Sequence, residues 1–126
     1  DAVFLGESGF VLPNNVLLEY PNLKQEQGNF TYRARRMEVR IYGGKVVENI
    51  CQAVARCIIA CQMGWISEHY KVALTVHDSL VCVVKDEEVE EARQFIEECM
   101  REAPEWAKGL PLDCESGIGK SYGECG

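Results

Sequence analysis

Two apolar segments with a very short polar connection constrain the fold of this chain more than any other feature. Residues 72–76 and 80–84 are rich in β-branched side chains, and only His77, Asp78 and Ser79 separate them. Strands joined by so short a connection must run antiparallel, because a parallel pair needs a crossover of about a dozen residues or more. We therefore expect a buried hairpin with a polar tip.

A long amphipathic helix is predicted for residues 45–63. Its apolar side chains recur at the three- and four-residue spacing of a buried helical face, at Val47, Ile50, Val54, Cys57, Ile58 and Cys61. On another side of the helix, a polar stripe follows the same spacing and consists of Lys45, Asn49, Gln52 and Arg56. Gly64 is expected to cap the C-terminus of this helix.

The remaining segments predict further strands and a second helix. Residues 10–12 and 16–20 are expected to pair around a turn at residues 13–15. Residues 25–29 predict an exposed loop, and residues 31–41 are compatible with strand or helix. A second amphipathic helix is predicted for residues 86–101 and an edge strand for residues 110–114.

This order of elements indicates the α+β class, with an antiparallel sheet and two main helices packed on it. The length of 126 residues fits a single domain, residues 1–126. No apolar run approaches the roughly 18 residues that span a bilayer, so no membrane partner is expected. Seven cysteines and no secretory signal favour a reduced, cytoplasmic chain. Cys57 and Cys61 could share a metal, but no CxxC pair or matched His spacing completes a zinc site.

The formal net charge of −7 argues at first against a nucleic-acid partner. The whole excess lies in residues 85–126, however, because residues 1–84 are neutral. Five basic side chains fall within residues 33–45, opposed only by Glu38, and these are Arg33, Arg35, Arg36, Arg40 and Lys45. Such a cluster is either a solvated face or a phosphate-facing strip.

The polar tip of the hairpin has two interpretations. Asp and Ser both favour turns because they hydrogen-bond to their own backbone, so the tripeptide could serve only as a turn. Alternatively, the stiff hairpin holds the Asp78 carboxylate at a fixed point, where it can bind Mg²⁺. This ion prefers hard oxygen ligands and usually takes only one or two protein carboxylates.

Two segments closely resemble the C-terminal palm of family A DNA polymerases, the bacterial polymerase I type and especially its phage members. The first is Tyr42-Gly-Gly-Lys-Val-Val-Glu-Asn-Ile-Cys-Gln-Ala-Val-Ala-Arg56, and the second is Leu74-Thr-Val-His-Asp-Ser-Leu-Val81. Residues 12–22, 103–112 and 119–123 look like other parts of the same palm. The resemblance therefore covers nearly the whole chain, in the right order.

This resemblance implies a palm-like fold and two-metal nucleotidyl transfer, from a dNTP to the primer 3′-hydroxyl, with Mg²⁺ as the metal. Asp78 would be one of two essential metal-binding aspartates, and His77 would lie near the primer 3′ end. The helix carrying Gln52 would face the minor groove of the primer–template duplex.

The polar stripe matches that implied role. Amide and ammonium groups of Lys45, Asn49 and Gln52 can bond minor-groove acceptors, which every base pair offers in similar places, so these contacts check pair shape rather than sequence. Arg56 would either contact the DNA backbone or pair with an acidic side chain.

The chain departs from the family pattern in three ways. Ser79 stands where the family usually has Glu, as in single-subunit phage-type RNA polymerases, and Cys57 stands where many members have Asp. The upstream strand with the first aspartate and the fingers helix that binds the triphosphate are not found. One carboxylate cannot hold two metals, so we expect a part of a polymerase that is inactive without the remainder of the polymerase chain. The start at Asp1 rather than Met fits an excised or processed piece.

Two other functions stay open from the sequence. One is a non-catalytic module that docks on duplex DNA or on a polymerase partner, and the other is a structural domain in which the tip is only a turn. An isolated palm would also expose apolar surface, which favours self-association.

Overall fold

The computed structural model describes residues 2–126 and divides into two compact units. The first unit ends at Cys57, and the second runs from Ile58 to Gly126. The single domain expected for residues 1–126 stays a prediction.

The first unit begins with a small antiparallel sheet of β1 (Phe4–Leu5), β2 (Gly9–Val11) and β3 (Leu17–Glu19). The predicted hairpin around residues 13–15 is confirmed by the pairing of Val11 with Leu17. Asn15 takes a positive φ of 64° in this turn, which Asn tolerates well. Gly9 is required where the strands meet, because a Cβ atom there would lie 2.0 Å from the Leu18 carbonyl oxygen.

A second antiparallel sheet follows, formed by β4 (Lys24–Glu26), β5 (Asn29–Ala34) and β6 (Met37–Ile41). The prediction of an exposed loop at residues 25–29 is wrong, because Gln27 and Gly28 make a tight turn between two strands. Both residues have positive φ, 50° and 80°, as the type I′ hairpin turn requires. The ambiguous residues 31–41 belong to two strands joined by a turn at Arg35 and Arg36, since apolar side chains in both strands alternate with polar ones.

Tyr20 is the buried centre of the first unit, with 6% of its surface exposed. Its ring packs edge-on against Phe10 at 6.4 Å and against Tyr32 at 5.1 Å, centroid to centroid. The backbone N–H of Arg33 donates to the Pro21 carbonyl at 2.8 Å, next to this aromatic cluster. Tyr20 therefore joins the two small sheets into one core.

The long helix α1 (Gly43–Ser67) confirms the predicted helix and extends past its predicted end. Gly64 lies inside α1 and is not its cap. Glycine costs about 1 kcal/mol in a helix interior, whereas burying Ile66 two residues later contributes roughly 1.5 to 3 kcal/mol, and Ile66 is fully buried. Val47, expected on the buried face, is 60% exposed, whereas Asn49 of the polar stripe is bonded to Tyr20.

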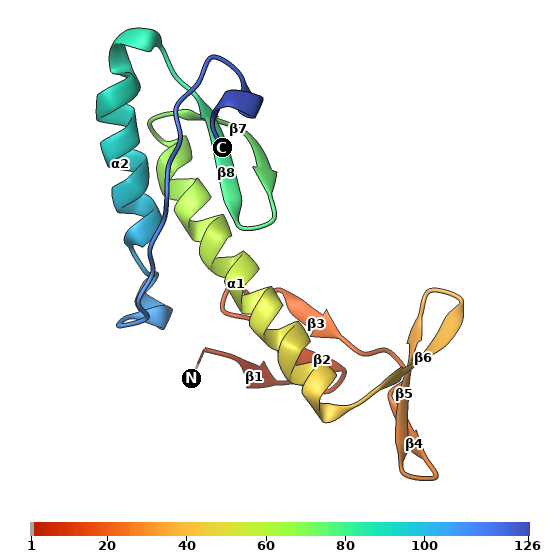
Figure 1. Cartoon of the computed structure of the whole chain (residues 1–126). Helices are drawn as coiled ribbons and strands as arrows, with labels where there is room; N and C mark the ends of the chain where they lie inside the picture. Colours follow the sequence, from red (N-terminus) through yellow and green to blue (C-terminus); the bar gives the residue numbers. More distant parts are fainter. Residues whose placement is uncertain (1) are drawn as a thin grey trace. The chain divides into compact units, whose positions relative to one another are not determined.

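The second unit contains the end of α1, the strands β7 (Lys71–Val76) and β8 (Ser79–Val83), and α2 (Val89–Arg101). A 3₁₀ turn at Asp86–Glu88 leads into α2, which lies alongside the end of α1 (Figure 1). Two residues of the predicted inward face, Ala92 and Cys99, are buried as expected. The Phe95 ring packs against His69 at 4.7 Å.

The edge strand predicted at residues 110–114 does not form. Two 3₁₀ turns, Glu105–Ala107 and Tyr122–Glu124, flank an irregular segment that is bonded to α2 rather than to a strand. Arg101 Nε lies 2.9 Å from Asp113 Oδ1, and Arg93 Nε donates to Ser116 Oγ at 2.9 Å. Side-chain bonds to the helix take the place of sheet pairing here.

By length and composition alone, α1 could cross a membrane, since an 18-residue window within it has a mean hydropathy of 1.3. A single helix of this kind is weak support for a membrane span, because core helices of soluble proteins meet the same criteria. The exposed side chains of Lys45, Gln52 and Arg56 lie on α1 as well.

The chain contains both helices and strands, with two main helices and small antiparallel sheets, in agreement with the predicted α+β class. The strands of the described residues form three separate sheets rather than one.

Candidate functional site

The tip of the β7–β8 hairpin is a two-residue turn. Val76 pairs with Ser79 across the strands, which leaves His77 and Asp78 as the connection and makes Ser79 the first residue of β8. His77 has a φ of 53°, in the left-handed region that residues with a Cβ atom rarely adopt. All three side chains are exposed. The predicted polar tip is confirmed, with two turn residues instead of three.

The hairpin that carries this tip was expected to be buried, and that prediction is wrong. Leu74 is 43% exposed, Val76 is 38% exposed and Val83 is 61% exposed. The physical reason is that β7 and β8 form a sheet of two strands, to which no other strand of residues 2–126 is bonded. Cys82 is half-buried in this sheet, and burial raises the pKa of its thiol.

The Asp78 carboxylate makes no hydrogen bond or ion pair with any residue in the described part of the chain, so both oxygens are available to a ligand. A carboxylate of this kind fits one position in the shell of Mg²⁺, which takes water and phosphate for the rest. Within residues 2–126, no three His, Cys, Asp or Glu side chains gather closely enough to form a metal site. Asp78 therefore fits as one ligand of a shared site.

The polar stripe on α1 is partly bound by a neighbouring acid. Lys45 Nζ lies 3.0 Å from both carboxylate oxygens of Glu48, and Gln52 Nε2 donates to Glu48 Oε1 at 3.2 Å. The hydrogen bond to Glu48, together with its charge, raises the pKa of Lys45. Sequence reasoning missed Glu48, although its three- and four-residue spacing from Lys45 and Gln52 is the signal for such contacts.

The other two members of the stripe differ from each other. Asn49 is half-buried, and its Nδ2 donates to the Tyr20 hydroxyl at 3.1 Å, which gives it a packing role in the first unit. Arg56 is exposed, and no ion pair to it occurs in the part of the chain that the structure describes. The structure thus brings Lys45, Gln52 and Glu48 together and leaves Arg56 apart.

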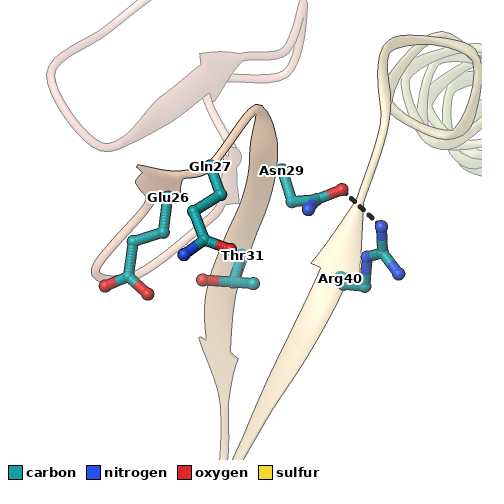
Figure 2. A pocket seen from close by; sticks show the side chains of 5 residues that line it. All are labelled: Glu26, Gln27, Asn29, Thr31 and Arg40. Atoms are coloured by element: carbon teal, nitrogen blue, oxygen red, sulfur yellow. Dashed lines mark hydrogen bonds between the residues drawn. The ribbon is translucent and has the colours of Figure 1, made fainter.

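Two surface hollows are lined by residues other than those of the tip. Figure 2 shows the first, on the sheet of β4, β5 and β6, where the Arg40 guanidinium donates to the Asn29 side-chain oxygen. Its lining residues are Glu26, Gln27, Asn29, Thr31 and Arg40. The second is an open groove between the end of α1 and β7, with Met63 and Leu74 among its lining residues. Neither hollow is lined by His77 or Asp78.

Comparison with known proteins gives a consistent result. The profile of the family described as DNA polymerase family A matches residues 23–124. A DNA polymerase of Bacillus phage SP02 is 34% identical over 134 aligned residues, which cover 94% of this chain and 20% of that protein. The chain thus spans about a fifth of the length of this curated relative. No solved structure gives a significant match.

Proposed function

Because this chain belongs to DNA polymerase family A, we propose that it is the C-terminal palm portion of a template-directed DNA polymerase. In this proposal the complete enzyme transfers a nucleotide from a dNTP to the 3′-hydroxyl of a primer. The observation that carries the proposal is the Asp78 carboxylate, free of protein partners and held in the tight turn of a hairpin.

Asp78 is the residue of this chain that we assign to the metal. When bound, Mg²⁺ would lower the pKa of the primer hydroxyl and stabilise the leaving pyrophosphate. The hairpin fixes the carboxylate within a two-residue turn, so the position of Asp78 depends on strand pairing rather than on a mobile loop. In this proposal His77, next to Asp78, contacts the primer terminus.

The polar stripe of α1 is proposed to contact duplex DNA. Gln52 is exposed and offers an amide for minor-groove acceptors, while Arg56 offers a guanidinium without an ion-pair partner in the described residues. Lys45 would exchange its contact with Glu48 for one with DNA. Asn49 would hold this part of α1 in place through its hydrogen bond to the Tyr20 hydroxyl.

The isolated chain is proposed to need the remainder of the polymerase. The described residues supply one candidate metal carboxylate, and two-metal transfer needs more than one. Primer–template DNA, dNTPs and the other polymerase segments are the partners that follow, in the interior of the cell. The exposed side chains of Leu74, Val76 and Val83 would favour self-association when those segments are absent.

The test is Asp78→Asn in the complete polymerase, measured by primer extension with Mg²⁺ and all four dNTPs. We expect the rate to fall at least about a hundredfold, because the neutral amide is a poor metal ligand and the site loses a charge in the transition state. Asp86→Asn is the matched control, since Asp86 is an exposed aspartate that pairs with Lys120 at 2.6 Å. Unchanged extension by Asp78→Asn would exclude the assigned role.

A non-catalytic DNA-binding module is the alternative, and it is favoured because no three His, Cys, Asp or Glu side chains gather into a metal site within residues 2–126. The same experiment separates the two. If the complete protein binds duplex DNA normally and its extension is indifferent to Asp78→Asn, the binding function is the correct one.

A further inference from the structure

The sheet of β4, β5 and β6 has two chemically different faces. Successive side chains of a strand point to opposite faces, so the register places alternate residues together. One face is largely apolar and packs toward Tyr20 through Tyr32. The other face carries polar and charged side chains, namely Lys24, Glu26, Asn29, Thr31, Arg33, Glu38 and Arg40.

Both carboxylates of the polar face are occupied by the same lysine. Lys24 Nζ lies 2.7 Å from Glu38 and 3.6 Å from Glu26, and these contacts raise the pKa of Lys24. The Arg40 guanidinium bonds only the neutral Asn29 amide oxygen among the described residues. Four arginines of this sheet and its turn are therefore left without a carboxylate partner in residues 2–126, namely Arg33, Arg35, Arg36 and Arg40.

Three of these arginines lie on a two-stranded projection. β4 pairs only with Asn29–Thr31, so residues 32–39 continue beyond it as two strands. The turn at the end consists of Arg35 and Arg36, and Arg35 has a φ of 54°. This turn and the turn between β4 and β5 lie at opposite ends of the sheet (Figure 1). We call residues 32–39, with exposed Arg33, Arg35 and Arg36, the arginine ribbon.

We infer that the arginine ribbon binds the phosphate backbone of nucleic acid, at a contact separate from the polar stripe of α1. A two-stranded ribbon fits the major groove of DNA, which is about 12 Å wide. Guanidinium groups bind phosphate through paired hydrogen bonds, and such contacts position a protein without reading sequence. The choice of DNA as the nucleic acid rests on the proposed function.

The test is the double variant Arg33→Gln/Arg36→Gln in this chain, with binding to a mixed-sequence duplex of about 20 base pairs measured over a range of salt concentrations. Each lost phosphate contact lowers the slope of log K against log salt by about 1, so the slope should fall by about 2. Near 0.1 M salt the affinity should fall about tenfold or more. A second duplex of unrelated sequence should give the same losses.

Two controls separate phosphate contact from loss of charge or of folding. Arg33→Lys/Arg36→Lys keeps the charge and should keep most of the salt slope. Lys85→Gln/Lys108→Gln removes the same charge from two other exposed positions and should leave the slope unchanged. Thermal unfolding of each variant shows whether the sheet is intact.

Three results would overturn the inference. One is a wild-type salt slope in the Arg33→Gln/Arg36→Gln variant, and another is no salt-dependent binding by the wild-type chain. The third is binding to polyglutamate with none to the duplex, which would identify an acidic protein as the partner. None of these results bears on the extension assay with Asp78→Asn, so the proposed function is judged independently.

Discussion

His77 holds the turn of the candidate site in a conformation that L-residues rarely adopt. Its φ of 53° is costly because the Cβ atom approaches the backbone carbonyl, and glycine has no Cβ atom. Histidine is present at this position even though glycine would satisfy the backbone better. Gln27 and Arg35 have the same left-handed conformation in the other two-residue turns, so this conformation is a property of these tight turns.

We predict that His77→Gly is more stable than His77→Ala by about 1 kcal/mol, because both remove the imidazole but only alanine keeps the strain. Urea unfolding of the two variants of this chain measures the difference. In the complete polymerase, both variants should extend primers more slowly than wild type. Equal stability of the two variants would show that the backbone at this position is not strained.

At the scale of secondary-structure elements, Gln62 links the two helices of the second unit. Its side chain is 2% exposed. The amide Nε2 donates to the Met100 carbonyl at 2.8 Å and to the Glu102 carbonyl at 3.3 Å. The last carbonyls of a helix have no partner within that helix, so a side chain from α1 satisfies the end of α2.

We predict that Gln62→Ala lowers the free energy of unfolding by about 2 to 4 kcal/mol, since it leaves carbonyl groups without a partner and opens a cavity. Gln52→Ala is the matched control, because it is the same change at an exposed position of the same helix, and it should alter stability by less than about 0.5 kcal/mol. Denaturant unfolding measures both variants.

Gln52, whose loss should hardly alter stability, is expected to matter for DNA binding. Gln52→Ala should weaken duplex binding by the complete enzyme, because its amide belongs to the proposed DNA-contacting stripe. A large loss of stability in Gln52→Ala would identify Gln52 as a structural residue instead.

At the scale of the whole molecule, charge is divided between the two units. Residues 1–57 carry seven basic and six acidic side chains, a net charge of +1, and residues 58–126 carry −8. Side chains of α2 hold the C-terminal segment of the acidic second unit through the Arg101–Asp113 ion pair and through hydrogen bonds of Arg93 and Glu97 with Ser116. Glu97 is the centre of these contacts, 3.1 Å from Arg93 and 3.4 Å from Arg101.

These contacts lower the pKa values of two carboxyl groups. Hydrogen bonds from Ser116 and Arg93 lower the pKa of Glu97, and the hydrogen bond from Arg101 lowers the pKa of Asp113. A carboxyl group whose pKa is lowered by folding stabilises the folded chain at pH values above its unfolded pKa of about 4. This stabilisation is lost as the pH falls through the lower pKa of the folded chain.

We therefore predict that the thermal midpoint of the chain falls between pH 5 and about 3, and that Glu97→Gln/Asp113→Asn reduces this fall. Thermal unfolding followed by circular dichroism across this range measures it. Glu115→Gln is the control, because Glu115 is an exposed neighbour without a hydrogen bond or ion pair in the described residues. An identical pH dependence in wild type and double variant would contradict the prediction.

Local patterns predicted the helices and the candidate tip well. The three- and four-residue spacing of apolar side chains identified α1 and α2, and the three-residue connection identified the β7–β8 hairpin with His77 and Asp78 at its end. The strand β4 was missed because its three residues, Lys24, Gln25 and Glu26, are all polar and exposed. Their pairing with β5 depends on the turn at Gln27 and Gly28, which a propensity argument underestimates.

By itself, the sequence determined the order of the main elements, the polar turn and the family resemblance, because these depend on neighbouring residues and short spacings. Only the tertiary structure decided how individual polar groups are used. Asn49 is bonded to Tyr20, 29 positions away, and Gln62 to carbonyls 38 and 40 positions away. The exposure of the hairpin is likewise a tertiary property, since whether an apolar strand is covered depends on which distant segments pack against it.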